Sequence, residues 1–497
     1  MKNAALIPTD MPYLFLPFRF KRFHDRKILL VNETGEFIFL PSEEFESLIS
    51  YKLDRKSGVY RDLKAKHFIT SAHSELAPVI DLLATKYRTK KSFLRNFTSL
   101  HMVVVTLRCN HRCNYCHASS QEADARRWDM SIETSRKVVD MIFQSPSPYI
   151  KIEFQGGEPL LNFKVVKEII KYAEKINHRL RKHLSFVLCT NLTLIDKDIL
   201  NFLKEHDVII STSLDGPKDI HDSNRVLRDG GSSYDCFVDK LFLTRSVLGI
   251  NKVSALMTVT NTNIHDLKKI IDEYVRLEFR GIFLRSLNPY GYAKKGSGEK
   301  LQYKVEEFVL AYEDAIEYIL QLNREGIAFV EYFAKIILTR ILTPFSTGFM
   351  DLQSPAGAGI LGAIYNYNGR IYPSDEARML SAMGDNHFCL GDVNHSSYME
   401  VFCSKHLAKI VQNSCVEIIP GCHSCAYQLY CGADPVRAYS QQKDSTYIGH
   451  MPTSEFCKKH MNLIDYFMRK IEQCDEDALD IFWSWVTNRN LPDITIQ

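Results

Sequence analysis

The sequence predicts an α/β protein whose central part is a partial (β/α)6 TIM-like barrel. Between residue 100 and about residue 287, six apolar runs alternate with helical patterns, and these runs span residues 102–107, 150–154, 186–189, 208–214, 253–259 and 281–287. Strands that alternate with helices form parallel sheets, because parallel neighbours need a crossover connection. Six units are fewer than the eight of a closed barrel. We therefore expect an open barrel whose ligands sit at the C-terminal ends of the strands.

The composition is that of an ordinary globular protein, and it excludes several functional classes. Of the 497 residues, 45% are hydrophobic and 24% are charged, so the chain is neither disordered nor collagen-like. The 62 basic and 59 acidic residues leave a formal charge of +3, which is too small to indicate nucleic acid or an anionic membrane as the main partner. No apolar run approaches the ~18 residues that a membrane-spanning helix needs. We expect no nucleic-acid partner and no membrane partner.

The 13 cysteines indicate metal or redox chemistry. Pro8 and Asp10 interrupt the N-terminus before any apolar core forms, so we expect no signal peptide and a cytoplasmic location. In a reducing compartment, a disulfide framework is not expected. Most of the cysteines gather in two regions, whereas three are solitary and are interpreted as small buried thiols: Cys189, Cys236 and Cys474.

The patterns divide the chain into four parts. They are a small α/β unit, the barrel, a helical connection, and a C-terminal region that holds the second cysteine group and the terminal helices: residues 1–95, 96–300, 301–349 and 350–497. The segment from about residue 350 is rich in loops, so we expect it to have little core of its own and to use a metal instead. Residues 303–325 and 463–485 are predicted to be helical.

Shorter patterns predict the elements of the first part. Two β-rich runs, 28–31 and 37–40, flank the turn at 32–35, which is typical of a hairpin. Ser42 is expected to cap the following helix, and a second amphipathic helix is expected near residues 79–87. The five basic residues between Lys86 and Arg95 are interpreted as a solvated linker rather than an anion site.

The first cysteine group has the spacing Cys-x3-Cys-x2-Cys and consists of Cys109, Cys113 and Cys116. Three thiolates can bind three irons of a cubane [4Fe–4S] cluster and leave the fourth iron without a protein ligand. The spacing alone also admits a structural zinc, for which His111 or His117 could supply the fourth ligand. The context favours iron–sulfur, because the group follows the first strand of the predicted barrel and Tyr115 precedes the last cysteine.

This loop resembles the signature of the radical S-adenosylmethionine (SAM) superfamily. The resemblance implies that the open iron binds SAM, and that reductive cleavage of SAM yields a 5′-deoxyadenosyl radical that abstracts hydrogen from a substrate. After the second predicted strand, the run Gln155-Gly156-Gly157-Glu158 resembles the Gly-Gly-Glu motif of the family. Glycine permits close backbone approach there, and Glu158 would accept the ammonium group of SAM. A plain Gly-Gly turn is the alternative, which the cysteine loop about forty residues upstream argues against.

The next two predicted strands end in residues that fit the same resemblance. Asn191 and Ser213 stand where similar enzymes present polar groups to SAM. Arg225 or Arg228 could pair with the SAM carboxylate, since a guanidinium suits that geometry, and a surface salt bridge is the alternative. The expected cofactor-binding residues are therefore Tyr115, Gln155, Gly156, Gly157, Glu158, Asn191, Ser213 and Arg225.

The second cysteine group supplies four thiolates, from Cys422, Cys425, Cys431 and Cys457. Four thiolates complete the ligation of a cubane, so a [4Fe–4S] cluster bound here would have no open iron, and a zinc ion is the alternative. The pattern resembles the SPASM domain of peptide-modifying radical SAM enzymes, which normally holds two auxiliary [4Fe–4S] clusters.

The chain departs from the SPASM pattern at the ligands of one of these two clusters. Ser374 and Asp434 stand where cysteines would be expected, and residues 354–359 lack a further one. We therefore expect one auxiliary cluster, with Cys389, Cys403 and Cys415 as free thiols, although Cys415 is the best candidate for an additional ligand.

Asp375 is the candidate catalytic residue. In sulfatase-maturing relatives, an acidic residue at the matching place accepts a proton from the substrate during its oxidation, and Asp375 would do so if it faces the radical site. The alternative is an ordinary loop carboxylate beside Glu376 and Arg378.

Particular runs along nearly the whole chain are similar to the His-Xaa-Ser system radical SAM maturase, among them residues 16–20, 33–37, 153–162, 375–380 and 430–436. The resemblance implies a ribosomally made peptide with His-Xaa-Ser repeats whose side chains are oxidised or cross-linked. It also implies a second radical SAM protein of the same system and an electron donor such as flavodoxin or ferredoxin. The alternatives are a sulfatase-maturase-like or small-molecule radical SAM enzyme, or a non-catalytic scaffold that only holds clusters.

The N-terminal unit resembles the peptide-recognition modules of such maturases. These modules capture a leader peptide by adding it as a strand to a sheet edge. We expect the edge near residues 28–31 or 37–40 to be the docking site, and a plain capping domain is the alternative.

Overall fold

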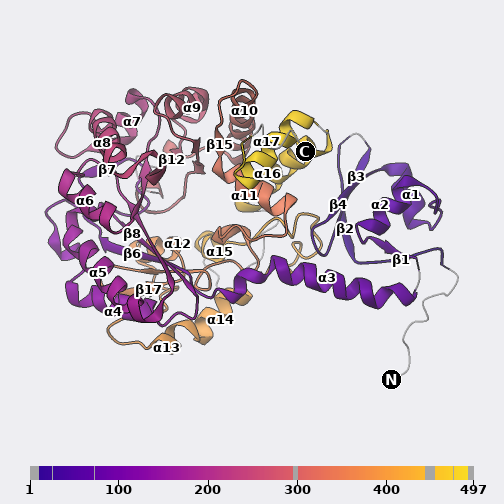
Figure 1. Ribbon diagram of the computed structural model, residues 1–497, viewed down its shortest axis with the longest axis horizontal. Helices are drawn as coiled ribbons and strands as arrows, with labels where there is room; N and C mark the ends of the chain where they lie inside the picture. Colours follow the sequence, from indigo (N-terminus) through magenta and orange to yellow (C-terminus); the bar gives the residue numbers. More distant parts are fainter. Residues whose placement is uncertain are drawn as a thin grey trace.

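The computed structural model describes residues 11–24, 26–71, 73–294, 300–442, 454–473 and 475–490. The barrel lies on one side and a small N-terminal unit on the other, with the long helix α3 (Leu76–Lys90) running between them (Figure 1). Cys474, predicted to be a buried thiol, and the first ten residues, on which the absence of a signal peptide was inferred, lie outside the described residues. No described helix has the length and hydrophobicity needed to span a membrane.

A nine-stranded sheet forms the centre of the molecule. Six of its strands are β6 (Leu100–Thr106), β8 (Tyr149–Gly156), β9 (His183–Cys189), β10 (Ile209–Ser213), β12 (Val253–Val259) and β14 (Leu284–Ser286). These six strands lie side by side in the sheet in the same order as they occur along the chain, and each strand is parallel to its neighbours among the six. The sheet does not close, because β14 forms one edge and β18 (Gly391–Asp392) forms the other. The predicted partial barrel is confirmed.

Crossover helices connect these strands, and all of them except α7 bury apolar residues. They are α4 (Ile132–Ile142), α5 (Phe163–Leu180), α6 (Lys197–Glu205), α7 (Lys218–Asn224), α8 (Ser233–Leu248) and α9 (Leu267–Arg276). In α5 the buried residues recur at helical spacing, at Val165, Val166, Ile169, Ile170 and Ala173. Side-chain caps fix several starting points, since Ser131, Asp196 and Ser232 accept backbone N–H groups of the first turns.

Three further strands extend the sheet beyond β6, where the sequence predicted loops with little core. They are β16 (Gly362–Tyr365), β17 (Arg370–Tyr372) and β18. β16 pairs in parallel with β6, and all four of its residues are buried. The loop prediction was wrong here because strands of two to four residues carry no recognisable period. The same region also contains α12 (Asp375–Ala382), α13 (Tyr398–Phe402), α14 (Lys405–Gln412) and α15 (Pro435–Gln442).

The remaining helices pack beside the barrel at the side of the N-terminal unit (Figure 1). They are α10 (Val305–Arg324), α11 (Tyr332–Leu342), α16 (Glu455–Glu472) and α17 (Glu476–Thr487). The helices predicted at 303–325 and 463–485 are confirmed, the second as two helices, because Asp475 caps the start of α17. The short strands β13 (Gly281–Ile282) and β15 (Val330–Glu331) pair in parallel, which places the start of α11 beside the segment that precedes β14.

The N-terminal unit contains a three-stranded antiparallel sheet with the order β2-β3-β4. Its elements are β1 (Leu14–Phe15), β2 (Phe18–Arg22), β3 (Lys27–Asn32), β4 (Phe37–Pro41), α1 (Ser42–Ile49), α2 (Gly58–Ala65) and β5 (Ile69–Thr70). The predicted hairpin is confirmed as β3 and β4, with Gly35 at φ +83° in the turn.

In this unit, one of the two runs considered as a docking edge is excluded, and the expected helix cap is wrong. The run 28–31 is no free edge, because β3 is the central strand and pairs with β2 as well as β4. Ser42 does not cap α1, because it is the first helical residue and its hydroxyl donates to the carbonyl of Arg26, while Pro41 holds the N-cap position.

The basic stretch from Lys86 to Arg95 is not the solvated linker that the sequence predicted. Lys86 pairs with Glu36, and Lys91 pairs with Glu417. Lys90 donates to the carbonyls of Arg340 and Thr343 at 3.4 and 3.2 Å, and burial lowers its pKa to about 8. Lys90 and Lys91 therefore attach the end of α3 to the C-terminal part of the chain, whereas Lys86 attaches α3 to the N-terminal unit. A run of charges looks the same in sequence whether its partners are water or distant carbonyl groups.

One face of the N-terminal sheet packs on the rest of the protein. Leu29 and Val31 belong to the main hydrophobic core, whereas Ile28 and Leu30 belong to the separate core of the N-terminal unit. Beside them, Arg19 donates from Nε to the carbonyl of His423 at 2.6 Å. The unit is thus held by both apolar packing and polar contacts.

Replacing Leu29 with Ala is expected to lower the free energy of unfolding by about 2–5 kcal/mol, because the fully buried side chain leaves a cavity between the two parts. Thermal unfolding of the whole chain measures it. Leu82→Ala is the control, since Leu82 is 44% exposed on α3 and its loss should cost less than about 0.5 kcal/mol. Equal losses in the two variants would contradict the docking role of Leu29.

Candidate active site

A cavity of about 390 Å³ opens at the C-terminal ends of the barrel strands. Parallel strands present all their C-terminal ends at one edge, so residues far apart in sequence meet there. Most of the predicted site residues line it: Cys109, Cys113, Tyr115, Cys116, Gln155, Gly156, Gly157, Asn191, Ser213, Arg225 and Asp375. Glu158 is the predicted residue of this group that is not part of the lining.

The two glycines after β8 bring the backbone against the segment that leads into the cysteine loop. A Cβ atom on Gly156 would lie 2.1 Å from the carbonyl oxygen of Thr106, and one on Gly157 would lie 2.2 Å from that of Arg108. The Gly157 N–H donates to the Thr106 carbonyl at 2.9 Å. Any side chain at either position would push the two segments apart, so glycine is required for this close approach.

Glu158 links the ends of two strands instead of lining the cavity. Its carboxylate accepts hydrogen bonds from Leu160 N at 3.0 Å, from Thr190 Oγ1 at 2.7 Å and from Asn191 N at 2.8 Å. Burial raises the pKa of Glu158 to about 7, because the charged form loses its water. The carboxylate therefore positions Asn191, which does line the cavity.

A buried group of three side chains fixes the cysteine loop to the end of β10. Tyr115 donates from its hydroxyl to Asp215 at 2.6 Å, and Arg225 donates from Nε to the same carboxylate at 3.1 Å. The Arg225 guanidinium also lies 5.5 Å from the centre of the Tyr115 ring. The strand β11 (Arg225–Leu227) pairs with β7 (His111–Cys113), which places Arg225 opposite Cys113.

The two arginines considered as partners of a cofactor carboxylate both have protein partners. Arg225 is paired with Asp215 in a buried salt bridge, not in the surface salt bridge that was the alternative, and it still lines the cavity. Arg228 donates from Nε to the carbonyl of Cys109 at 3.0 Å and pairs with Glu122. Arg228 is not part of the lining.

Some lining residues were missed by the sequence reasoning. Arg285 lies at the end of β14, and its place at the end of the sixth apolar run was the signal that could have identified it. Arg378 pairs with Asp375, Nε to Oδ1 at 3.1 Å, and so holds that carboxylate at the cavity wall. Such a pairing within one helical turn is visible in sequence only once the helix start is known.

The thiols of the first group suit a strongly cationic partner. Burial raises the pKa of Cys113 to about 12, and it raises the pKa of Cys109 as well. A thiol so desolvated becomes a thiolate only beside a metal or another strong positive charge. The three cysteines, the glycine pair and the polar strand ends therefore fit an iron–sulfur cluster with a small zwitterionic cofactor beside it.

Comparison with known proteins places this chain in a family. The family model described as the radical SAM superfamily matches residues 103–274, which span β6 to α9. This range includes most of the residues that line the cavity, among them the three cysteines and Arg225. An uncharacterized protein of Methanocaldococcus jannaschii is 30% identical over 212 residues, which is 42% of this chain and 68% of that protein. The chain belongs to the radical SAM superfamily. Membership implies a [4Fe–4S] cluster and SAM.

Several relatives of this radical SAM protein are maturases. The cysteine-type anaerobic sulfatase-maturating enzyme of Clostridium perfringens is 24% identical over 375 residues, 72% of this chain and 93% of that enzyme. The structure of anSMEcpe with bound AdoMet shares the fold, with a TM-score of 0.64, 18% identity, and coverage of 76% of this chain and 99% of that one. SuiB of Streptococcus suis bound to the precursor peptide SuiA has a TM-score of 0.51, 13% identity, and coverage of 86% and 97%.

The four cysteines of the second group gather outside the radical SAM barrel. Burial raises the pKa of Cys431 to about 12, and nearby thiolates of the other three cysteines raise it further. Cys457 lies in the first turn of α16, with its sulfur 3.5 Å from that of Met461. Among the described residues, no group of three His, Cys, Asp or Glu side chains is arranged to hold a single metal ion.

The positions without the expected cysteines have other structural roles. The Ser374 hydroxyl caps α12 by accepting the N–H of Ala377 at 3.3 Å, and the Asp434 carboxylate accepts the N–H of Arg437 at 2.9 Å. Of the three cysteines that were expected to be free thiols in this region, Cys403 is exposed, and Cys389 and Cys415 are partly buried. The Cys415 thiol approaches the carbonyl of Val411 at 3.5 Å.

Asp215→Asn is expected to lower the free energy of unfolding of this radical SAM protein by about 3–5 kcal/mol, because it leaves the buried Arg225 guanidinium without its partner. Thermal unfolding of the chain without added SAM measures it. Asp235→Asn is the matched control, since Asp235 forms an exposed pair with Lys218 that is worth less than about 1 kcal/mol. A loss as small for Asp215 as for Asp235 would contradict the role of the buried group.

Proposed function

We propose that this chain is a radical SAM maturase that oxidises or cross-links side chains of a ribosomally made peptide. The arrangement that supports the proposal is the meeting of Cys109, Cys113 and Cys116 with the glycine pair and Asp375 around one cavity. Cluster and SAM, when bound, would supply the one-electron chemistry that yields a 5′-deoxyadenosyl radical. The lining residues of the chain would orient the cofactor and exclude water.

Each set of lining residues has a separate task in this proposal. The three cysteines hold the [4Fe–4S] cluster, and the backbone at Gly156 and Gly157 lets SAM approach closely. Gln155, Asn191 and Ser213 present polar groups to SAM, while Tyr115 and Arg225 fix the loop, and Glu158 fixes Asn191. Asp375 accepts the proton that the substrate loses on oxidation, and Arg378 orients its carboxylate.

The second group of cysteines would hold one auxiliary [4Fe–4S] cluster that carries the electron released by the substrate. Cys422, Cys425, Cys431 and Cys457 provide four thiolates, enough for full ligation, and Ser374 and Asp434 leave no thiolate for another cluster at their positions. A zinc ion is the alternative and would leave no electron route. The electron donor would be a flavodoxin or ferredoxin, and the protein would work in the cytosol.

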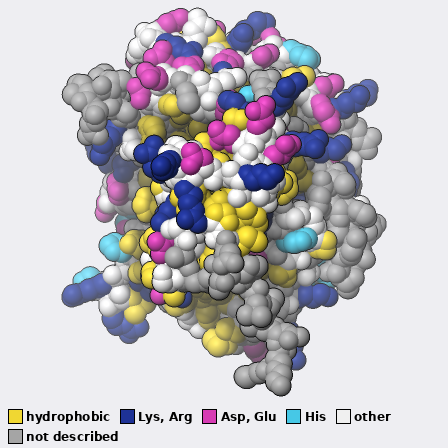
Figure 2. Space-filling view, turned by 90° about the vertical axis from the view of Figure 1, so that its right-hand side faces the viewer, with side chains coloured by type: hydrophobic (Ala, Val, Ile, Leu, Met, Phe, Trp, Pro, Cys, Tyr) yellow, Lys and Arg dark blue, Asp and Glu magenta, His cyan; other side chains and the backbone are white. Residues whose placement is uncertain are grey.

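The N-terminal unit would bind the leader of the peptide. The free edges of its sheet are β2 and β4, to which an extended leader could add as a strand. Figure 2 shows the face that this unit presents, where hydrophobic side chains gather with Lys and Arg beside them. Phe20 on β2 and Ile49 on α1 are its large hydrophobic residues that are about half exposed. The complex of SuiB with a precursor peptide supports a peptide substrate for this fold.

A peptide of the His-Xaa-Ser type, with a second radical SAM protein of the same system, is the substrate and partner that the sequence resemblance favours. A sulfatase-type maturation is the second candidate, since the sulfatase-maturating relative spans 72% of this chain. Coexpression with a His-Xaa-Ser precursor or with a sulfatase peptide, followed by mass spectrometry of the peptide, separates the two. A mass change in only one peptide identifies the substrate.

Anaerobic reconstitution is expected to load about eight irons per chain, four for each of two cubane clusters. With reductant and SAM, the protein should then form 5′-deoxyadenosine, measured by liquid chromatography. Changing Cys109, Cys113 and Cys116 to Ala should abolish formation of 5′-deoxyadenosine and lower the iron content by about half. Cys403→Ala is the control, because this exposed thiol belongs to neither group and should retain both. About twelve irons would contradict the single auxiliary cluster.

Cys422→Ala and Asp375→Asn should separate SAM cleavage from peptide oxidation. Both variants should still form 5′-deoxyadenosine, because neither residue belongs to the first cysteine group. Modified peptide should fall by about 10²–10⁴-fold in Asp375→Asn, the range for loss of a proton acceptor. Asp385→Asn, beyond the other end of α12, is the control with normal peptide yield. Normal yield in Asp375→Asn would exclude this residue as the proton acceptor.

A further inference from the structure

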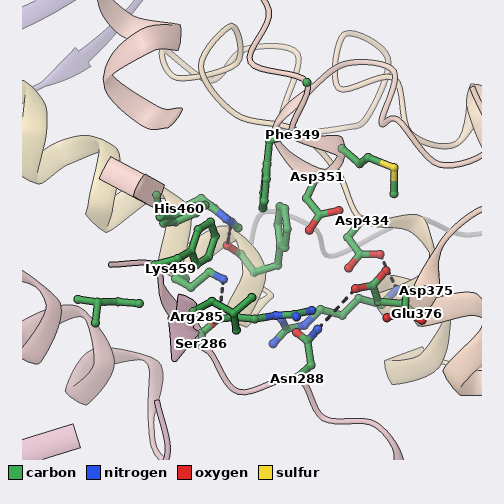
Figure 3. A pocket seen from close by; sticks show the side chains of 18 of the residues that line it. Arg285, Ser286, Asn288, Phe349, Asp351, Asp375, Glu376, Asp434, Lys459 and His460 are labelled. Carbon is green, nitrogen blue, oxygen red and sulfur yellow. Dashed lines mark hydrogen bonds between the residues drawn. The ribbon is translucent and has the colours of Figure 1, made fainter. Parts of the chain in front are cut away.

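A second cavity of about 340 Å³ adjoins the first. The two cavities share lining residues Gln155, Leu256, Arg285 and Asp375, so a molecule in the second can reach the cofactor side of the first. The second cavity lies beside the positions at which the SPASM pattern would have the ligands of a further auxiliary cluster. Asp434 is one of these positions, Asp375 directly follows another, Ser374, and both aspartates line the cavity. Figure 3 shows carboxylates on one side of this cavity and Lys459 and His460 on the other, with Phe349 between them.

Three carboxylates form the acidic wall, and they come from three separate segments: Asp351, Glu376 and Asp434. The segments meet because residue 432 is glycine, since a Cβ atom there would lie 2.1 Å from the carbonyl oxygen of Asp351. In Figure 3, the three side chains point toward one another. Burial raises the pKa of Glu376 to about 8, and the neighbouring Asp351 and Asp434 add to the effect.

These carboxylates lack a cationic partner within the described part of the chain. Glu376 accepts a 3.5 Å hydrogen bond from Asn288, Asp434 accepts the backbone N–H groups of Val436 and Arg437, and no hydrogen bond or ion pair to the Asp351 carboxylate is seen within the described residues. By contrast, the fourth carboxylate of the cavity, Asp375, is paired with Arg378. Asp351, Glu376 and Asp434 are partly buried. Carboxylates that are partly desolvated and lack an ion-pair partner are unfavourable, so this wall is suited to a ligand that brings N–H donors and positive charge.

His460 adds an independent acceptor on the other side. It is 2% exposed, and its Nδ1 lies 2.8 Å from the carbonyl oxygen of Phe456. A carbonyl only accepts, so Nδ1 carries the proton and Nε2 is left as an acceptor. Burial lowers the pKa of His460 well below its usual value, which keeps the ring neutral. Nε2 has no hydrogen-bond partner among the described residues, although the ring lines the cavity.

Among the described residues, the cations of the cavity form no ion pair with the acidic wall, although Arg285, Arg437 and Lys459 act on its carboxylates at longer range. Lys459 donates to the hydroxyl of Ser286 at 3.0 Å, and Arg437 lies 3.7 Å from Glu455. Arg285 stands where the two cavities meet. A peptide offers both kinds of complementary group, because its backbone carbonyls accept from cations while a basic side chain donates to carboxylates.

We propose that this cavity receives a basic side chain of the peptide substrate, bound by the carboxylates of Asp351, Glu376 and Asp434, while Arg285 donates to a peptide carbonyl group. The inference rests on the proposed peptide-modifying function and names the chemistry of the residue that enters the site. The bound side chain lies next to Asp375, and hence beside the cofactor cavity. The acidic wall thus selects the residue that is presented for oxidation.

Binding of small probes to the reconstituted full-length protein tests this proposal without turnover. The probes are Nα-acetyl-arginine amide and Nα-acetyl-lysine amide, each with a neutral isostere, the citrulline and norleucine amides. At least one basic probe should bind with a dissociation constant of about 1 mM or below, and its isostere about tenfold more weakly, by calorimetry or ligand-detected NMR. Equal binding of the basic probe and its isostere, stronger binding of Nα-acetyl-glutamate amide, or no binding overturns the proposal.

Two charge-removing variants with opposite expectations accompany the probes. Asp434→Asn should weaken binding of the basic probe about tenfold, whereas Lys459→Met, in the same cavity, should leave it unchanged or strengthen it. Glu376→Gln replaces Asp434→Asn if the latter unfolds. Weaker binding in Lys459→Met with unchanged binding in the carboxylate variants overturns the proposal. Because SAM is not needed, probe binding in a protein that forms no 5′-deoxyadenosine would refute the proposed function alone, and the reverse result would refute the cavity assignment alone.

Discussion

The close contact between the ends of β6 and β8 is the constraint on which the site depends. The backbone at Gly156 and Gly157 lies against Thr106 and Arg108, so the chain enters the cysteine loop at a fixed place beside the second strand. The loop is then held from the other side by Asp215, through Tyr115 and Arg225. If residues 156 and 157 carried side chains, the two segments could not approach each other, and the loop and the polar strand ends would not surround a common cavity.

The sequence predicted the features that carry a period or a fixed spacing. The six parallel strands and their helices were predictable because apolar residues recur over five or more positions in most of them. The short strands β16 to β18 were not, and neither were the contacts of Lys90 and Lys91, since their partners lie about 250 or more residues away. Likewise, the cysteine loop marked the site, but only the fold could show that Arg225 binds Asp215 and that Arg285 borders both cavities.

Ser374 and Asp434, which stand where the sequence resemblance would place cysteines, are both polar residues. Both side chains take part in helix starts, and the region keeps a cavity with carboxylates on one wall and aromatic and aliphatic side chains over much of the rest. Keeping buried charge is unfavourable for stability unless something binds it. The acidic wall therefore indicates that the space is used for a ligand rather than for packing.

The attachment of the N-terminal sheet has a consequence for the length of any bound peptide. The sheet is fixed through Leu29, Arg19 and the lysines of α3, so its edge and the reaction cavity keep a constant separation. An extended chain covers at most about 3.3–3.6 Å per residue. A peptide anchored by its leader would need a minimum number of residues between the leader and the residue that enters the cavity. The fixed separation would therefore set the smallest distance along the peptide between the leader and the first modified residue.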